Sequence, residues 1–163
     1  SEAPPVHRQD VFREVAVASE KVSFLKQYEP FKEITDQETG FLDIILTESV
    51  FKRGETIFAE GQVSDTMYVI RKGIVKIFRR TKEEEQTIAV ASPGEFFGEM
   101  ALIDSSPRSA SVRASDDTAT LTITRRNMAY LQSHKPELAL KIYKILLRTV
   151  ALRMRRTLKK TVK

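Results

Sequence analysis

Residues 97–112 read F-G-E-M-A-L-I-D-S-S-P-R-S-A-S-V and combine groups that suit a phosphate beside a sugar. Gly98 has no Cβ, so a ligand can approach the backbone closely there. The turn that follows can present free N–H groups to an anion, and the Arg108 guanidinium can make a two-pronged contact with phosphate. Glu99 repels phosphate but can accept hydrogen bonds from a sugar hydroxyl. The stretch therefore predicts a site for a phosphate joined to a sugar, as in a small cyclic nucleotide.

Two motifs in this stretch resemble the phosphate-binding cassette of the cyclic nucleotide-binding domain family. That family includes domains of the catabolite activator protein, the protein kinase A regulatory subunit and cyclic nucleotide-gated channels. Its pattern F-G-E-x-A-L stands at residues 97–102, and its pattern P-R-[AST]-A-x-V stands at residues 107–112. Upstream glycines also match, at Gly54, Gly61 and Gly73, and the resemblance covers about residues 30 to 155.

The resemblance implies a set of ligand-binding residues within these motifs. They are Phe97, Gly98, Glu99, Met100, Ala101, Arg108, Ser109 and Ala110. Arg108 is expected to bind the equatorial oxygens of a cyclic phosphate, and the backbone amides of Ser109 and Ala110 to face the same group. Glu99 is expected to accept a hydrogen bond from the ribose 2′-hydroxyl, with an ion pair inside the fold as its alternative role.

Ser109 leaves the base of the ligand open. In the family a Ser or Thr at this place can contact guanine, yet Ser also occurs in domains that bind cyclic AMP. We favour cyclic AMP over cyclic GMP on family frequency. The resemblance also implies that the last helix covers the base, and the candidate base contacts are Ala91, Thr149 and Arg153. The alternative is a plain core position for Ala91 and an exposed helix position for the other two.

Composition argues against several other kinds of site. The chain has 163 residues, which suits one domain; 41% of them are apolar and none is cysteine, so disulfides and thiolate metal sites are excluded. His7 and His134 are the only histidines, which argues against a metal centre. No nucleophile comes with a base and an orienting group, so we expect no catalytic residues, no enzyme activity and no cofactor besides the nucleotide ligand. No membrane span or signal peptide is visible, and we expect a cytoplasmic protein.

The net charge of +5 is unevenly distributed. Residues 141–163 carry nine Lys or Arg and no Asp or Glu, which leaves 18 basic and 22 acidic side chains in the rest of the chain. This basic tail is expected to be a solvated helix face whose cations favour the helix C-terminus. A weak, salt-sensitive contact with nucleic acid or an anionic membrane is the alternative.

The hydrophobic pattern predicts an α+β fold, with an antiparallel β jelly roll between N-terminal helices and a long C-terminal helix. The expected strands are Ser49–Phe51, Thr56–Phe58, Met67–Arg71, Val75–Arg79, Thr87–Ala91, Ala110–Ala114 and Ala119–Thr124. Residues 82–86 are expected to form a solvated hairpin loop. The chain then divides into an N-terminal tail and helical segment (1–48), the jelly roll with its cassette (49–124) and C-terminal helices with the basic tail (125–163).

Two helices are expected before the strands. Residues 11–26 have a weak helical period, and residues 30–34 look like a short turn. Thr35 and Glu38 have the spacing of a capping box, which predicts a helix start. The buried face of this second helix is expected to hold Phe41, Leu42, Ile44, Ile45 and Leu46.

Two more helices are expected after the strands. Residues 125–133 predict one with Met128 and Leu131 inward, and Pro136 suits the first turn of a last helix that reaches about Lys160. The last helix carries two apolar stripes, Leu140, Tyr143, Leu147, Val150 and Met154, and Leu138, Ile142, Ile145, Thr149 and Leu152. Because two stripes can serve the chain's own domain and a partner, we expect a homodimer through this helix, as in the family. The alternative is that both stripes pack against the same chain.

These observations predict a cyclic nucleotide-binding regulatory module that couples ligand binding to movement of its C-terminal helix. One alternative is the sensor part of a transcription regulator of the catabolite activator type that lacks its DNA-binding domain, since no helix-turn-helix fits before Lys163. Another is a dimerisation module with a degenerate pocket, which the intact cassette disfavours.

Overall fold

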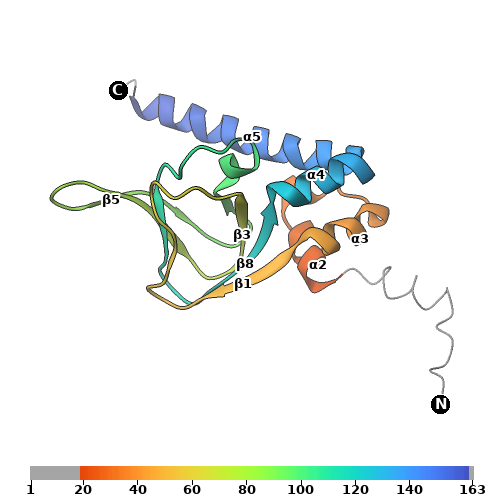
Figure 1. The fold of residues 1–163 in the computed structure, drawn as a ribbon, viewed down its shortest axis with the longest axis horizontal. Coiled ribbons are helices and arrows are strands. Elements are labelled where there is room, and N and C mark those ends of the chain that lie inside the picture. Colours follow the sequence, from red (N-terminus) through yellow and green to blue (C-terminus); the bar gives the residue numbers. More distant parts are fainter. Residues whose placement is uncertain (1–18, 162–163) are drawn as a thin grey trace, which may run out of the picture.

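Eight short strands form two antiparallel sheets in the computed structural model, which describes residues 19–161 (Figure 1). One sheet has the strand order β1-β8-β3-β6 and the other β2-β7-β4-β5. The strands are β1 (Thr47–Phe51), β2 (Thr56–Phe58), β3 (Thr66–Lys72), β4 (Val75–Arg80), β5 (Glu85–Ala91), β6 (Phe96–Phe97), β7 (Ser111–Ala114) and β8 (Thr118–Thr124). The chain changes sheet between all consecutive strands except β4 and β5, which confirms the predicted jelly roll.

All seven strands predicted from the sequence are present, with ends that shift by two residues at most. The strand that the sequence missed is β6, which has only two residues between the turn at Gly94 and Gly98. Two residues are too few to display an alternating hydrophobic pattern, so β6 is identified only by its pairing with β3.

The hairpin loop predicted for residues 82–86 is wrong at its end, because Glu85 and Gln86 belong to β5. The Glu85 carboxylate accepts hydrogen bonds from Lys76 Nζ on β4 at 2.9 Å and from Arg113 Nη2 on β7 at 2.6 Å. These contacts join three neighbouring strands. Charged residues that look like a loop in the sequence thus extend the sheet.

Helices α2 (Glu20–Lys26) and α3 (Asp36–Ile45) precede the strands, with the 3-10 turn η1 (Glu29–Phe31) between them. Of the helix predicted over residues 11–26, the described part is α2, and residues 11–18 lie outside the described residues. The capping box is confirmed, because the Thr35 N–H donates to Glu38 Oε1 at 2.9 Å.

The buried face of α3 is only partly as predicted. Leu42, Ile45 and Leu46 are buried, and Phe41 packs against the same core. Ile44 was expected there and is 70% exposed, because it points away from the side of α3 that covers the core. A run of neighbouring apolar residues does not show which of them faces solvent.

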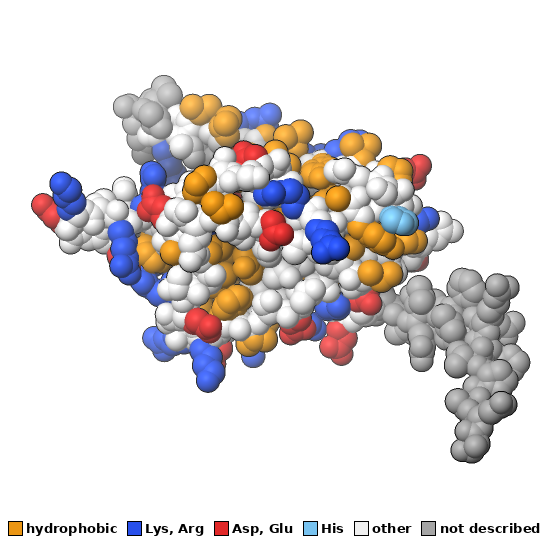
Figure 2. Space-filling model, in the orientation of Figure 1, with side chains coloured by type: hydrophobic (Ala, Val, Ile, Leu, Met, Phe, Trp, Pro, Cys, Tyr) orange, Lys and Arg blue, Asp and Glu red, His pale blue; other side chains and the backbone are white. Residues whose placement is uncertain are grey.

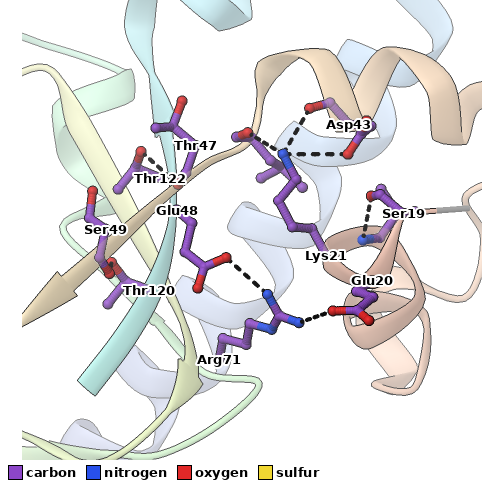
Figure 3. A network of polar contacts seen from close by, with 12 residues as sticks. Ser19, Glu20, Lys21, Asp43, Thr47, Glu48, Ser49, Arg71, Thr120 and Thr122 are labelled. Atoms are coloured by element: carbon purple, nitrogen blue, oxygen red, sulfur yellow. Dashed lines mark hydrogen bonds and ion pairs between the residues drawn. The ribbon is translucent and has the colours of Figure 1, made fainter. Parts of the chain in front are cut away.

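Polar contacts fasten α2 to the strands and to α3 (Figure 3). Arg71 of β3 lies between Glu48 of β1 and Glu20 of α2, with nitrogen–oxygen distances of 3.0 and 3.4 Å. Lys21 Nζ donates to the Leu46 carbonyl at 3.0 Å, where a cation suits the C-terminal end of α3. The helical end of the molecule is therefore fixed to the sheet that contains β3.

Helices α4 (Arg125–His134) and α5 (Pro136–Thr161) follow the last strand. Met128 and Leu131 of α4 are buried as predicted, and Pro136 opens α5 as predicted. Figure 1 shows α5 passing beside the other helices and then extending above the strands. No helix of residues 19–161 has the length and apolarity needed to cross a membrane.

The two stripes of α5 differ in burial. One packs against the chain's own helices and includes the buried residues Leu138, Ile142 and Ile145. In the other, Leu140, Leu147 and Met154 are exposed by 55, 71 and 63%. Figure 2 shows hydrophobic side chains along this edge of α5, at the top of the view. This stripe is thus open at Leu140, Leu147 and Met154, while its Tyr143 packs against the core.

Candidate functional site

A hollow of about 310 Å³ lies among strands β2, β4 and β7, helix α5 and the 3-10 turn η2 (Glu99–Leu102) that follows β6. The residues that the cassette pattern indicated all line it. They are Phe97, Gly98, Glu99, Met100, Ala101, Arg108, Ser109 and Ala110. The fold therefore brings both halves of the motif to one place, although a loop separates them in sequence.

Gly98 lets the backbone and Arg108 lie against each other. It precedes η2 with a φ of +75°, a region that favours glycine. Its carbonyl accepts a hydrogen bond from Arg108 Nη1 at 3.0 Å. A Cβ built on Gly98 would lie only 2.7 Å from that nitrogen, so a side chain there would displace the guanidinium.

Arg108 is held rigidly in the wall of the hollow, with only 7% of the residue exposed. Its Nη2 donates to Ser64 Oγ at 3.0 Å and to the Thr66 carbonyl at 2.6 Å. The guanidinium carbon lies 3.9 Å from the centre of the Phe58 ring, which is a cation–π contact. Burial lowers the pKa of Arg108, and the nearby acidic groups of Tyr68, Glu99 and Asp65 partly offset that shift. The guanidinium still remains charged at any physiological pH.

Two further features of Arg108 indicate that its partners are incomplete. Its Nε is buried and has no hydrogen-bond partner in the described part of the chain. Among residues 19–161, none of the ion pairs involves Arg108. A buried charge without a counter-ion costs free energy. The arrangement therefore suits an anion that enters the hollow.

Glu99 faces helix α5 across the hollow. Arg153 Nη1 donates to Glu99 Oε1 at 3.0 Å, and Arg153 also donates to the Phe96 carbonyl and lies over the Phe96 ring. The alternative role considered for Glu99, an ion pair within the fold, is thus present. This pair connects η2 directly to the C-terminal helix.

Of the three candidate base contacts, only Arg153 lines the hollow. Ala91 is buried in the core cluster with Phe97 and Val75, so its place fits the core alternative. The Thr149 hydroxyl donates to the Ile145 carbonyl, one turn earlier in α5, at 3.0 Å. It lines a separate groove beside η1.

Comparison with known proteins places the chain in a family. The sequence profile described as "Cyclic nucleotide-binding domain" matches residues 48–134, more than half of the chain. The chain belongs to the cyclic nucleotide-binding domain family. The cassette pattern that suggested this resemblance lies inside the matched residues.

Three relatives illustrate the range of the family. The domain is 34% identical to a CRP-like cAMP-activated global transcriptional regulator of Mycobacterium tuberculosis, over 66% of this chain and 46% of the regulator. It is 31% identical to a cGMP-dependent protein kinase of Eimeria tenella, over 66% of this chain and 10% of the kinase. The crystal structure of Thermus thermophilus catabolite activator protein superimposes with a TM-score of 0.71 at 28% identity, over 81% of this chain and 61% of that one. The chain spans less than half the length of these two curated relatives.

Sequence reasoning missed part of the domain's pocket. Phe58, Ile77 and Val112 supply apolar walls, and Asp104 and Ser106 lie at its rim loop. The strand alternation around Ile77 and Val112 marks them as inward, but it does not distinguish a pocket wall from a core position. Ser64 and Thr66 hold Arg108 from outside any motif, so no sequence signal was available for them.

Proposed function

We propose that this domain binds a cyclic nucleotide, cyclic AMP in preference to cyclic GMP, and transmits binding to helix α5. The observation that carries the proposal is the buried guanidinium of Arg108, which lines the hollow and has no carboxylate partner among residues 19–161. A cyclic phosphate supplies the missing negative charge and further acceptor oxygens. Hydrogen bonds to charged groups contribute roughly 1.5–3 kcal/mol each, so this pairing would dominate affinity.

In this proposal Glu99 serves the ribose and helix α5 together. Glu99 and Arg108 line the same hollow, so a phosphate at Arg108 brings the attached ribose close to Glu99. A carboxylate has about four acceptor positions, and Arg153 Nη1 uses one of them. The 2′-hydroxyl can therefore donate to Glu99 while the ion pair with Arg153 is kept or rearranged.

The Arg153–Glu99 pair is the contact that would carry coupling. Arg153 is on α5 and Glu99 is on η2, so a ligand that changes the hydrogen bonding of Glu99 changes the free energy of the α5 contact. The coupling is reciprocal: the factor by which the ligand changes the equilibrium between positions of α5 is also the factor by which that position changes nucleotide affinity. A segment or partner attached to α5 would therefore respond to ligand binding.

The preference for cyclic AMP rests on family relationships. One relative is a cAMP-activated regulator and another is a cGMP-dependent kinase, so both bases occur near this sequence. Ser109 lines the hollow and suits either base. The chain is 34% identical to the mycobacterial regulator and 36% identical to a cyclic AMP receptor protein of Thermus thermophilus, against 31% for the kinase, which favours cyclic AMP.

Calorimetric titration of both nucleotides tests the proposal. The wild-type domain should bind cyclic AMP more tightly than cyclic GMP. Arg108→Ala should weaken binding by about 2–5 kcal/mol, or roughly 30-fold or more, because it leaves the bound phosphate unpaired. Arg126→Ala, a change at an exposed arginine outside the hollow, is the matched control and should bind as the wild type does.

Three results would contradict separate parts of this proposal. Absence of heat with either nucleotide on the wild-type domain would support a degenerate module instead. Equal affinity of Arg108→Ala and the wild type would refute the phosphate role of Arg108. Tighter binding of cyclic GMP would reverse the preferred base.

We also propose that the domain forms a homodimer through α5 and acts as the sensor part of a longer regulator. The exposed stripe that contains Leu140, Leu147 and Met154 has the seven-residue spacing of a helix–helix seam. The residues that match the mycobacterial transcriptional regulator make up only 46% of that protein, which supports the second point.

A further inference from the structure

Arg125 occupies a place where a cation is unfavourable for its own helix. It is the first residue of α4, and the first turn of α4 contains Arg125 and Arg126 but no acidic residue. The N-terminus of a helix carries partial positive charge, so acidic residues are the usual choice there. A local rule broken in this way often marks a functional demand.

The Arg125 side chain leaves α4 and binds the end of the cassette turn. Its Nε and Nη2 donate to the Ala101 carbonyl at 3.0 and 2.8 Å, and Nη2 also donates to the Asp104 carbonyl at 2.6 Å. Its Nη1 donates to Ser105 Oγ at 3.3 Å. The guanidinium thus supplies hydrogen bonds to carbonyl groups at the end of η2 and in the loop that leads to Arg108. A positive group is favoured at the C-terminal end of a helical turn.

The backbone of Arg125 joins the same residue to the other support of the phosphate site. Its N–H donates to the Asp65 carbonyl at 2.9 Å. The neighbours of Asp65 are Ser64 and Thr66, which hold the Arg108 guanidinium. The side chain of Arg125 therefore contacts the cassette. Its backbone N–H contacts Asp65, between the two residues that hold Arg108.

We propose that Arg125 is a positioning residue that holds residues 101–105 in the ligand-binding arrangement and links them to α4 and α5. This inference rests on the proposed function and adds a second route from the pocket to the C-terminal helices. The Arg153–Glu99 pair reaches the far part of α5, whereas Arg125 acts at the start of α4.

The start of α4 does not need the Arg125 side chain for its own stability. Thr124 and Asn127 form a capping box, with Thr124 N–H to Asn127 Oδ1 at 3.0 Å and Asn127 N–H to Thr124 Oγ1 at 3.1 Å. Met128 and Leu131 anchor α4 in the core. Replacement of Arg125 should therefore leave α4 folded and change mainly the cassette.

Three variants test the inference: Arg125→Met, Arg125→Lys and the matched control Arg126→Met. Cyclic AMP affinity is measured by calorimetry, and hydrogen exchange of residues 136–160 is compared with and without saturating cyclic AMP. Arg125→Met should bind at least about tenfold more weakly and, once saturated, should lose most of the exchange response of α5. Arg125→Lys should be intermediate, because an ammonium keeps the charge but lacks the planar fork. Arg126→Met should match the wild type in both measurements.

The inference is overturned if Arg125→Met binds within twofold of wild type and shows the same exchange response. If Arg125→Met does not fold, Arg125→Lys decides, and wild-type affinity and response in that variant would overturn the inference. Failure of the wild-type domain itself to bind either nucleotide would instead remove the proposed function, and the inference with it. A loss confined to the Arg125 variants separates the two cases.

Discussion

Gly98 and Arg108 depend on each other in this domain. The cassette pattern indicated the glycine for close approach of a ligand and the arginine for a phosphate contact. The structure adds that the Gly98 carbonyl accepts from Arg108 and that the arginine fills the space of a missing Cβ. The spacing of the two residues in the sequence could not predict this contact, because it depends on the path of the loop between them.

A matched pair of glycine substitutions separates backbone strain from loss of the site. Gly98→Ala should cost about 1–2 kcal/mol of unfolding free energy because of its positive φ, and more because the new Cβ meets Arg108. Cyclic AMP affinity should also fall by about tenfold or more. Gly54 has a φ of +87°, and no atom of the described residues lies within 4 Å of a Cβ built there, so Gly54→Ala should lose stability but keep affinity.

Chemical denaturation and calorimetry on the two variants measure both quantities. Full affinity in Gly98→Ala would show that the guanidinium can move aside without cost. Equal loss of affinity in Gly54→Ala would mean that general destabilisation, and not the contact with Arg108, weakens binding.

The residues that the sequence identified least well are those whose roles depend on another element. The motif placed Glu99 in the site, but only the fold shows that Arg153 of α5 pairs with it. Thr149 and Arg153 are one turn apart on α5, yet only Arg153 reaches the hollow. Distance along a helix does not show how far that helix extends over the strands.

Among the elements, the long helices and the alternating strands were predicted from their periods, and the shortest and most charged ones were not. Pro136 and the 3.6-residue period correctly indicated the start and extent of α5. The end of the β4–β5 hairpin was misjudged, because Glu85 looks like a solvated loop residue in the sequence. In the fold, Glu85 joins β5 to β4 and β7 through Lys76 and Arg113.

The Glu85 contacts predict a specific pH dependence of stability. Hydrogen bonds from Arg113 and then Lys76 lower the pKa of Glu85 from 4.5 to about 2 in the folded domain. Because the folded pKa is below the unfolded one, the stabilising contribution is fully present above pH 4.5 and is lost as pH falls toward 2. Glu85→Gln should therefore be less stable than wild type near neutral pH, and the difference should shrink steadily below pH 4.5.

Urea unfolding of the two proteins from pH 7 down to pH 2.5 measures this difference, and effects of all other titrating groups cancel between them. Glu84→Gln changes the adjacent exposed carboxylate and should show no such trend. A wild-type advantage that stayed constant down to pH 2.5 would contradict the role assigned to the Glu85 charge.

At the scale of the whole molecule, α5 contributes to the core, to the hollow and to the exposed surface. Its buried stripe packs on the helices, Arg153 closes one side of the hollow, and its other stripe faces outward (Figure 2). The two stripes were visible in the sequence, but which one the domain uses for its own core was not. The structure assigns Leu138, Ile142 and Ile145 to the core and leaves Leu147 open.

The open stripe predicts that two copies associate through α5 and that Leu147→Glu separates them. Leu147 is 71% exposed at the middle of the seven-residue series, so a carboxylate there would be desolvated in a dimer but solvated in a monomer. Sedimentation velocity over a range of concentrations should give a dimer for the wild type and a monomer for Leu147→Glu.

Leu152→Glu introduces the same charge at an exposed leucine that borders the groove beside η1, so it should remain dimeric. A wild-type domain that stays monomeric at every concentration, or a Leu147→Glu variant as dimeric as the wild type, would rule out this face as the seam.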